Sequence, residues 1–480
     1  MDVSEKSRKP KIGFLFIGSR RFKTLGENTK SGTYNERIAK ETAMISAELK
    51  DESDIVNPGD VFDTEDLERA LHCFTRQNVD CILVMFHSWA EDNIWIRFLR
   101  ESDPVIPLIY FCPARYSIPF ETCEDENDLV EFLSSGGLVG SLVGSGSMTK
   151  FGRTAKYLVG TPKQKKNEII QYANLCKIRS VLHRSRFGIL PAYNEIMWNT
   201  YVDPYRLFEY GPELTFIGYD EFSAISDKVG ENEVLSLKKE LEALYPVSGG
   251  ISDEKFLASV RYSIGLLKTM QAYNIDALTL NDVDMRLFEK IGLRSGFYPN
   301  AINESCSILC PEADIGIALS MYLLKLLTGK QINTVEPFYI DDSKNLFCGG
   351  HAGPNDYNYP QSTQYVKISF DARFAKTKYR YAGAPFAWLR IPPGRMTMVH
   401  ISQGKGEIKM VASLVDSLDG QHRTNSYAHS DFRPVNCSIS DFFEKIFAIG
   451  TTQHFVVVEG EYMEEMRDLA SLCGFGFYAV

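Results

Sequence analysis

The sequence lacks a long uncharged hydrophobic run and a secretory leader. No stretch of about 18 apolar residues is free of charge, so a membrane span is not expected. The first residues, MDVSEKSRKPKIGFLFIG, pass directly from charged side chains to a short strand-like run, without the apolar segment and small-residue cleavage site of a signal peptide. These absences predict a cytoplasmic protein.

Paired cysteines and an excess of positive charge are also missing. The 10 cysteines are scattered from Cys73 to Cys473 without a CxxC pair, which argues against a disulfide scaffold and a thiol-rich zinc site. The formal net charge is -10, whereas a nucleic-acid surface needs clustered Lys and Arg. We therefore expect a small-molecule partner and no nucleic acid.

What is present is enough apolar sequence for several cores, since 44% of the 480 residues are hydrophobic. Between residues 11 and 178, short apolar segments such as KIGFLFIG and DCILVMFH alternate with helical stretches, which indicates βαβ units around a parallel sheet. A second α/β segment begins near CKIRSVLHRSRFGIL. Beyond about residue 333, short alternating segments such as GEIKMVASLV are typical of antiparallel strands.

The expected fold is therefore α/β, with two Rossmann-like α/β domains followed by a mainly antiparallel β C-terminal domain. The expected boundaries are 1–178, 179–332 and 333–480. The stretch GGLVGSLVGSGSMTKFG matches neither the dinucleotide nor the P-loop pattern, and it is expected to form a glycine-rich turn beside a sheet. A nucleotide-dependent enzyme that uses Gly144 and Gly146 of this stretch is the weakest functional hypothesis.

The segment after Cys310 begins with two acids before an apolar helical run. Pro311 fits the first turn of a helix, and we expect the helix to extend to Leu327 before Gly329. Glu312 and Asp314 would then lie at the positive end of the helix, where capping alone explains both.

Capping does not explain two later residues, Glu336 at the start of the β region and His351 in the glycine-rich turn CGGHAG. Two carboxylates and an imidazole from separate elements suit Mn²⁺ or a similar divalent ion, whereas zinc more often recruits Cys or more His. The spacing alone is not diagnostic of a metal. His454, in GTTQHFVVVEGEY, has the alternation of a buried core histidine.

Several segments resemble the L-arabinose isomerase and L-fucose isomerase family, in the same order along almost the whole chain. They are IGS after the first strand, VMFHSWAEDNIWI, GGLVGSLVG, RFGILPAYNEIMWN and EADIGIALSMYLLKLLTG. The resemblance implies an aldose–ketose isomerase that acts on a sugar through an enediol, with Mn²⁺, or another divalent metal such as Co²⁺ or Mg²⁺. It also implies a homohexamer, or a tetramer, with active sites between subunits.

The resemblance also implies residue roles. Glu312 and Glu336 match the two metal-binding acids of the family, and His351 and His454 match its two metal-binding histidines. The two glutamates are also expected to be the catalytic pair that moves a proton between C2 and C1 of the sugar. Asp314 is expected to orient a metal ligand without binding the metal itself.

Other positions depart from arabinose isomerases or concern the substrate. The first loop, IGSRRFKTLG, carries Arg20, Arg21 and Lys23 where those enzymes have an uncharged glutamine and a Tyr-Gly. The arginines are either part of a solvated basic loop or cations that bind a sulfonate, phosphate or carboxylate. Gln453 is a further candidate for substrate binding.

A second departure lies in LNDVD, where Asn281 and Asp282 replace an aromatic wall and predict a wider, more polar pocket. An anionic hexose such as sulfoquinovose, converted to its ketose, is therefore an alternative to a neutral pentose or 6-deoxyhexose. A non-catalytic sugar-binding protein on the same scaffold is an alternative of another class.

Overall fold

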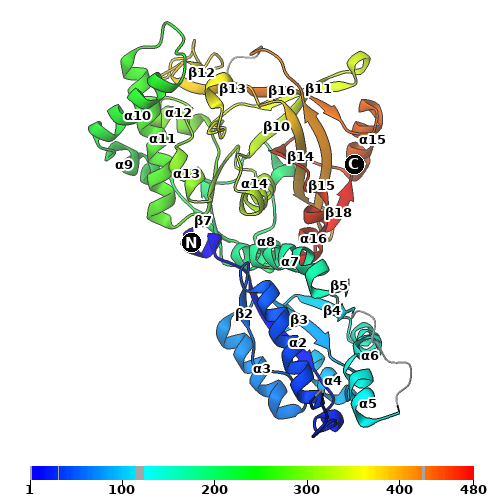
Figure 1. Ribbon diagram of the computed structural model, residues 1–480. Helices are drawn as coiled ribbons and strands as arrows, with labels where there is room; N and C mark the ends of the chain where they lie inside the picture. Colours follow the sequence, from blue (N-terminus) through cyan, green and yellow to red (C-terminus); the bar gives the residue numbers. More distant parts are fainter. Residues whose placement is uncertain (1–2, 31, 115–123, 424–426) are drawn as a thin grey trace. The chain divides into compact units, whose positions relative to one another are not determined.

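The computed structural model describes residues 3–30, 32–114, 124–423 and 427–480 (Figure 1). The chain forms two compact units, Ser7–Ser180 and Val181–Val480, and the second also includes the described part of Met1–Lys6. Two parallel sheets and a largely antiparallel C-terminal sheet confirm the expected α/β class and its order along the chain. The finer division at residues 178 and 332 stays a prediction.

The unit Val181–Val480 begins with a four-stranded parallel sheet in the order β7-β6-β8-β9. Its strands are β6 (Arg186–Leu190), β7 (Glu213–Phe216), β8 (Ala277–Leu280) and β9 (Ile308–Pro311). The helices of this part are α8 (Pro204–Tyr210), α9 (Tyr219–Asp227), α10 (Glu231–Leu244), α11 (Asp253–Tyr273), α12 (Met285–Ile291), α13 (Asn300–Glu304) and α14 (Ile315–Thr328). Strands β8 and β9 are buried along their whole length, as expected for a sheet that is covered on both faces.

The C-terminal part is a seven-stranded sheet in the order β14-β17-β10-β11-β16-β15-β18, and it closes on itself because β14 also pairs with β15. Its strands are β10 (Asn333–Asp341), β11 (Leu346–His351), β14 (Gly394–Gln403), β15 (Ile408–Ser417), β16 (Ala428–Pro434), β17 (Phe455–Glu459) and β18 (Gly476–Ala479). Strands β12 (Val366–Phe370) and β13 (Pro385–Leu389) form a separate pair, and helices α15 (Ile439–Ile449) and α16 (Met463–Cys473) complete the region. All pairings in the large sheet are antiparallel except that of β15 with β18.

Helix α14 packs against the parallel sheet through β8 and β9 and against the antiparallel sheet through β14 and β17. It is buried from Ile315 to Lys325, which explains why it is apolar on every side. The helix starts at the cap Asp314 and ends at Gly329, whose φ of 66° is left-handed. Pro311 ends strand β9 and does not belong to the helix, so its expected place in the first helical turn is wrong.

The unit Ser7–Ser180 is a five-stranded parallel sheet in the order β2-β1-β3-β4-β5. Its strands are β1 (Lys11–Ile17), β2 (Asp54–Val56), β3 (Cys81–Phe86), β4 (Leu108–Pro113) and β5 (Lys156–Gly160). Its helices are α2 (Tyr34–Leu49), α3 (Thr64–Gln77), α4 (Asp92–Glu101), α5 (Glu126–Ser134), α6 (Gly137–Lys150) and α7 (Pro162–His183), the last of which runs into the other unit.

The glycine-rich stretch after residue 135 is helix α6 and not the expected turn. A Cβ at Gly140 would lie 2.2 Å from the carbonyl oxygen of Ser88, and one at Gly144 would lie 2.3 Å from the hydroxyl of Tyr110. The glycines therefore allow the helix to pack closely on the ends of β3 and β4. This packing outweighs the low helix propensity of glycine. Because Gly144 and Gly146 lie within a helix, they do not form the loop that the nucleotide hypothesis requires.

Within the described residues, one segment is long and apolar enough to cross a membrane by length and composition alone. This segment, Glu126–Lys150, covers α5 and α6, and 33% of its apolar window is buried in the structure. Core helices of proteins without a membrane span also meet this criterion, so the segment is weak evidence for a membrane span.

A buried histidine follows β3 and joins three parts of this unit. The His87 side chain is fully buried, and its Nδ1 lies 2.9 Å from Glu41 of α2 while its Nε2 lies 3.2 Å from Asp60. Thr42 also donates to Asp60 at 2.7 Å. Burial lowers the pKa of His87, but the two carboxylates outweigh burial and raise the pKa above its ordinary value.

This geometry predicts that the unit Ser7–Ser180 loses stability as the pH rises. Because the pKa of His87 is raised on folding, its contribution is fully present below the unfolded pKa of about 6.5 and is lost as the pH rises through the folded pKa. Hydrogen exchange of the strand amides, corrected for intrinsic rates, measures the effect. His87→Gln should remove this pH dependence, and an equal dependence in the variant would contradict the assignment.

Candidate metal centre

Four side chains from separate elements converge in the unit Val181–Val480. Glu312 lies between β9 and α14, Glu336 lies in β10, His351 ends β11, and His454 immediately precedes β17. One potential ligand atom from each residue lies within 4.8 Å of those of the other three. The structure therefore brings together the four residues that the family resemblance assigns to a metal.

The four side chains differ in their access to solvent. The closest contact joins Nε2 of His454 to Oε2 of Glu312 at 3.2 Å, and the same nitrogen lies 3.5 Å from Oε1 of Glu336. Nε2 of His351 lies 3.8 Å from Glu312 and 4.0 Å from Glu336. Both histidines are 1% exposed and Glu312 is 6% exposed, whereas Glu336 is 26% exposed. The cluster therefore opens at Glu336.

A strained turn presents Glu312. Both Glu312 and Ala313 have left-handed φ angles, of 61° and 57°. Residues with a Cβ adopt this conformation at a cost of roughly 1–2 kcal/mol each. The Glu312 amide donates to Asp282 at 3.0 Å, and the Ala313 amide donates to the carbonyl of Leu280 at 3.3 Å. These bonds hold a turn that the local sequence does not favour.

A bulge in β10 and a glycine in β11 help to set the positions of Glu336 and His351. Glu336 is opposite Gly350, and the pairing register shifts between Pro337 and Tyr339, directly after this acid. A Cβ at Gly350 would lie 1.8 Å from the carbonyl oxygen of Ala428, so glycine is required for β16 to approach. His351 is thus the last residue of a strand, which corrects its expected place in a turn.

Hydrogen bonds hold both the ring and the backbone carbonyl of His454. Its Nδ1 lies 2.9 Å from Oδ2 of Asp314, whose other oxygen caps α14 by accepting the Ile317 amide at 2.9 Å. His400 bonds through Nδ1 to the carbonyl of His454 at 2.7 Å, and burial lowers the pKa of His400 to about 4, so that its ring is neutral. Asp314 therefore fixes the ring and exposes Nε2 to the two glutamates.

The electrostatics of the cluster suit a divalent ion. Burial raises the pKa of Glu312, but His351 and His454 outweigh it and lower the pKa below the ordinary value, so the group is a carboxylate. Nδ1 of His351 lies 2.5 Å from the carbonyl of Ala352, while its buried Nε2 has no hydrogen-bond partner among the described residues. With two carboxylates nearby, at 3.8 Å to Glu312 and 4.0 Å to Glu336, this buried nitrogen fits a metal ligand. The ligand atoms present are therefore two imidazole nitrogens and carboxylate oxygens.

Other residues expected at the site have different surroundings. Gln453 donates to the sulfur of Met197 at 3.4 Å, and its role in substrate binding stays a prediction. Arg20 and Arg21 lie in a short helical turn of the unit Ser7–Ser180, where Arg21 is 76% exposed and lies 3.6 Å from Glu91. Their contact with a substrate stays a prediction.

The expectation that Asn281 and Asp282 make the pocket more polar is wrong. Asn281 is 1% exposed and donates to Glu195 at 3.2 Å. Asp282 is fully buried, accepts the amide of Glu312 and forms an ion pair with Arg294. Asp282 thus contacts the backbone of Glu312, and neither residue lines the cleft described below.

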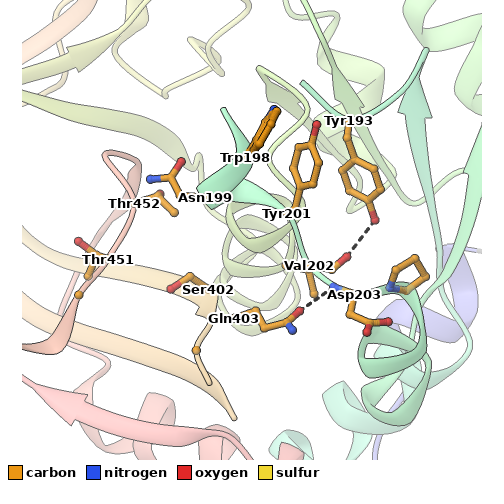
Figure 2. Close-up of a pocket in the computed structure, with 13 residues that line it drawn as sticks. Tyr193, Trp198, Asn199, Tyr201, Val202, Asp203, Ser402, Gln403, Thr451 and Thr452 are labelled. Atoms are coloured by element: carbon orange, nitrogen blue, oxygen red, sulfur yellow. Dashed lines mark hydrogen bonds between the residues drawn. The ribbon is translucent and has the colours of Figure 1, made fainter. Parts of the chain in front are cut away.

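An aromatic cleft lies beside the segment that leads to His454 (Figure 2). Its volume is about 580 Å³. The lining residues are Tyr193, Trp198, Asn199, Tyr201, Val202, Asp203, Pro204, Ser402, Gln403, Gly404, Gly450, Thr451 and Thr452. Figure 2 shows the hydrogen bond from Tyr193 to the carbonyl of Val202, at 3.0 Å, and that from the Asp203 amide to Gln403, at 2.6 Å.

Hydrogen bonds connect this cleft to the metal centre on two sides. Tyr201 donates to the carbonyl of Asn194 at 2.8 Å, and Asn194 donates to the carbonyl of Glu312 at 3.4 Å. On the other side, the hydroxyl of Thr452 accepts the amide of His454 at 3.2 Å. Sequence patterns did not indicate Asn194, Thr452 or the aromatic cleft, because their partners lie far away along the chain.

Comparisons with known proteins add no family assignment. No protein-family model matches the chain, and no curated protein matches it. One solved structure that is retrieved is the periplasmic sugar-binding protein of an ABC sugar transporter from Legionella pneumophila, at 10% identity and a TM-score of 0.14. The match covers 67% of this chain and 94% of that one, and such a low TM-score supports no inference.

The protonation of His454 would make binding of a metal at this cluster dependent on pH. Burial lowers the pKa of His454, but Asp314, Glu312 and Glu336 outweigh it and raise the pKa well above the ordinary value. A metal needs the Nε2 lone pair, so binding at pH 7 should release about one proton per ion and weaken on acidification.

Isothermal titration calorimetry with Mn²⁺ in buffers of different ionisation enthalpy counts these protons. Asp314→Asn should reduce the number, because it removes the largest influence that raises the pKa of His454. A binding enthalpy that does not depend on the buffer would contradict the protonated state.

Proposed function

We propose that this protein is a metal-dependent aldose–ketose isomerase. The observation that carries the proposal is the convergence of two glutamates and two histidines within 4.8 Å, three of them buried and one open to solvent. Glu312, Glu336, His351 and His454 would hold the ion, with Mn²⁺ favoured by the mixture of carboxylate and imidazole ligands.

Isomerisation of an aldose requires a proton to move between C2 and C1 through an enediol, and paired carboxylates are suited to hold that proton. Glu336 is partly exposed and accessible to a sugar, whereas Glu312 is held among the two histidines. When bound, the divalent ion would act as a Lewis acid that polarises the carbonyl and hydroxyl oxygens of the sugar. Asp314 would keep the His454 ring oriented while the proton moves.

The aromatic cleft supports a sugar as the substrate, since aromatic rings with nearby amide and hydroxyl groups suit a carbohydrate's apolar faces and hydroxyls. Trp198 is 75% exposed, and its indole nitrogen donates to the carbonyl of Glu195 at 2.6 Å, which orients the ring. A neutral pentose or 6-deoxyhexose is the substrate that the family resemblance favours. An anionic hexose such as sulfoquinovose is the alternative if Arg20 and Arg21 bind the substrate.

Two further parts of the proposal rest on the sequence and the family resemblance alone. They are a cytoplasmic location and a homohexamer or tetramer with active sites between subunits. A non-catalytic sugar-binding protein is the competing function, and it predicts that sugars stabilise the fold without being converted.

The proposed reaction predicts that metal-stripped protein has no isomerase activity and that added Mn²⁺ restores it. Glu312→Gln and Glu336→Gln should each lower the turnover by roughly 10²- to 10⁴-fold, the range typical of a general acid or base. The assay measures ketose formation from L-arabinose, L-fucose, D-glucose and sulfoquinovose.

Glu254→Gln is a matched control, because Glu254 is an exposed glutamate of the same unit, paired only with Arg380 among the ion pairs of the described residues. It should keep full activity. Folded wild-type protein that binds Mn²⁺ and converts none of these sugars would contradict the proposal and favour the binding protein.

A further inference from the structure

A buried ion pair lies directly behind the metal centre. The side chains of Arg294 and Asp282 are 4% and 0% exposed, and they approach to 2.6 Å. Removing both charges from water is costly, and a buried pair is therefore weak evidence for a purely stabilising role. Its other contacts indicate what the pair does.

Asp282 uses its second oxygen to hold the turn of the first metal-binding acid. Oδ1 accepts the backbone amide of Glu312 at 3.0 Å, while Oδ2 faces Arg294. This bond orients the backbone amide of Glu312, and the left-handed φ of Glu312 sets where its Cβ lies relative to that amide. The carboxylate of Asp282 therefore holds the backbone from which the Glu312 side chain projects.

Arg294 contacts the backbone beside the first metal-binding histidine. Its Nη2 donates to the carbonyl of Ala352 at 3.1 Å, and Nδ1 of His351 lies 2.5 Å from the same oxygen. The chain then passes tightly over the pair, since a Cβ at Gly353 would lie 2.9 Å from Asp282 and 3.5 Å from Arg294. Glycine at position 353, with φ of 119°, is what permits this approach.

We infer that Arg294 and Asp282 are positioning residues that fix the spacing between Glu312 and His351. Glu312 follows a strand of the parallel sheet and His351 ends a strand of the antiparallel sheet, and the ion pair bonds to the backbone at both places. This inference rests on the proposed metal centre, because the spacing that it fixes is that of two metal ligands. The planar guanidinium reaches Asp282 and Ala352 together, which a lysine ammonium does not reproduce.

The test is Arg294→Lys, which keeps the positive charge but removes the planar guanidinium that reaches Asp282 and Ala352 together. Co²⁺ is the probe, because its visible absorption reports ligand geometry as well as affinity. Arg294→Lys should weaken Co²⁺ binding by about 10- to 100-fold, the effect typical of groups that orient metal ligands, and should change the Co²⁺ spectrum. A change in fold stability alone would not alter the spectrum of the bound ion.

Arg286→Lys is the matched control, because Arg286 pairs with Asp284 only two residues from Asp282, but the arginine is 64% exposed. It should bind Co²⁺ with wild-type affinity and spectrum. If Arg294→Lys does not fold, the double variant Asp282→Asn with Arg294→Met removes both charges together, a change that folded proteins tolerate better than an unpaired buried charge. The same loss of affinity is expected.

Wild-type affinity and an unchanged spectrum in the folded variant would overturn the inference. Absence of Co²⁺ binding by the wild-type protein would overturn both the inference and the metal centre. Wild-type protein that binds Co²⁺ tightly but converts no sugar would contradict the proposed reaction alone. The Co²⁺ affinity of Arg294→Lys relative to that of the wild-type protein would still decide the inference.

Discussion

The structure of the unit Val181–Val480 is organised around carboxylates and imidazoles that share a small, mostly buried volume. Such groups are costly to bury unless each finds a partner. His454 meets this requirement through Asp314, and Glu312 through two histidines, but the buried Nε2 of His351 finds no hydrogen-bond partner in the part of the chain that the structure describes. A divalent cation completes these interactions better than any side chain present, which is why the cluster supports a metal centre more strongly than a structural one.

The surrounding backbone departs from regular structure where it serves this cluster. The left-handed pair Glu312 and Ala313, the bulge after Glu336 and the close crossing of β16 over Gly350 all lie at, or within two residues of, a member of the cluster. Each is unfavourable or demanding in isolation, and each is held by contacts from another strand. The two sheets of this unit also share one hydrophobic core. Their packing sets the approximate distance between the four clustered side chains, and the ion pair of Arg294 and Asp282 adjusts the distance between Glu312 and His351.

Local patterns predicted the elements better than the site. Helix α14 was anticipated because an acid cap, an apolar run and a following glycine all lie within one segment, although Pro311 was placed on the wrong side of the boundary. Helix α6 does not follow from local patterns, because its glycines serve close packing on two strands, a tertiary effect that outweighs helix propensity. The four candidate metal ligands are indicated by the family resemblance alone, since residues on four separate elements have no spacing that defines a motif. The sequence marks Asp282 as a departure from the family pattern but does not show its contacts, because these depend on Arg294 and on a turn that no periodicity reveals.

The central claim is that Glu312, Glu336, His351 and His454 hold one divalent ion. The most direct test is anomalous diffraction at the manganese absorption edge from crystals grown with Mn²⁺. The account predicts one strong anomalous peak within bonding distance of all four side chains, and its disappearance in His351→Ala crystals grown in the same way. A wild-type map without a peak at the cluster, or with manganese bound only elsewhere, would contradict it.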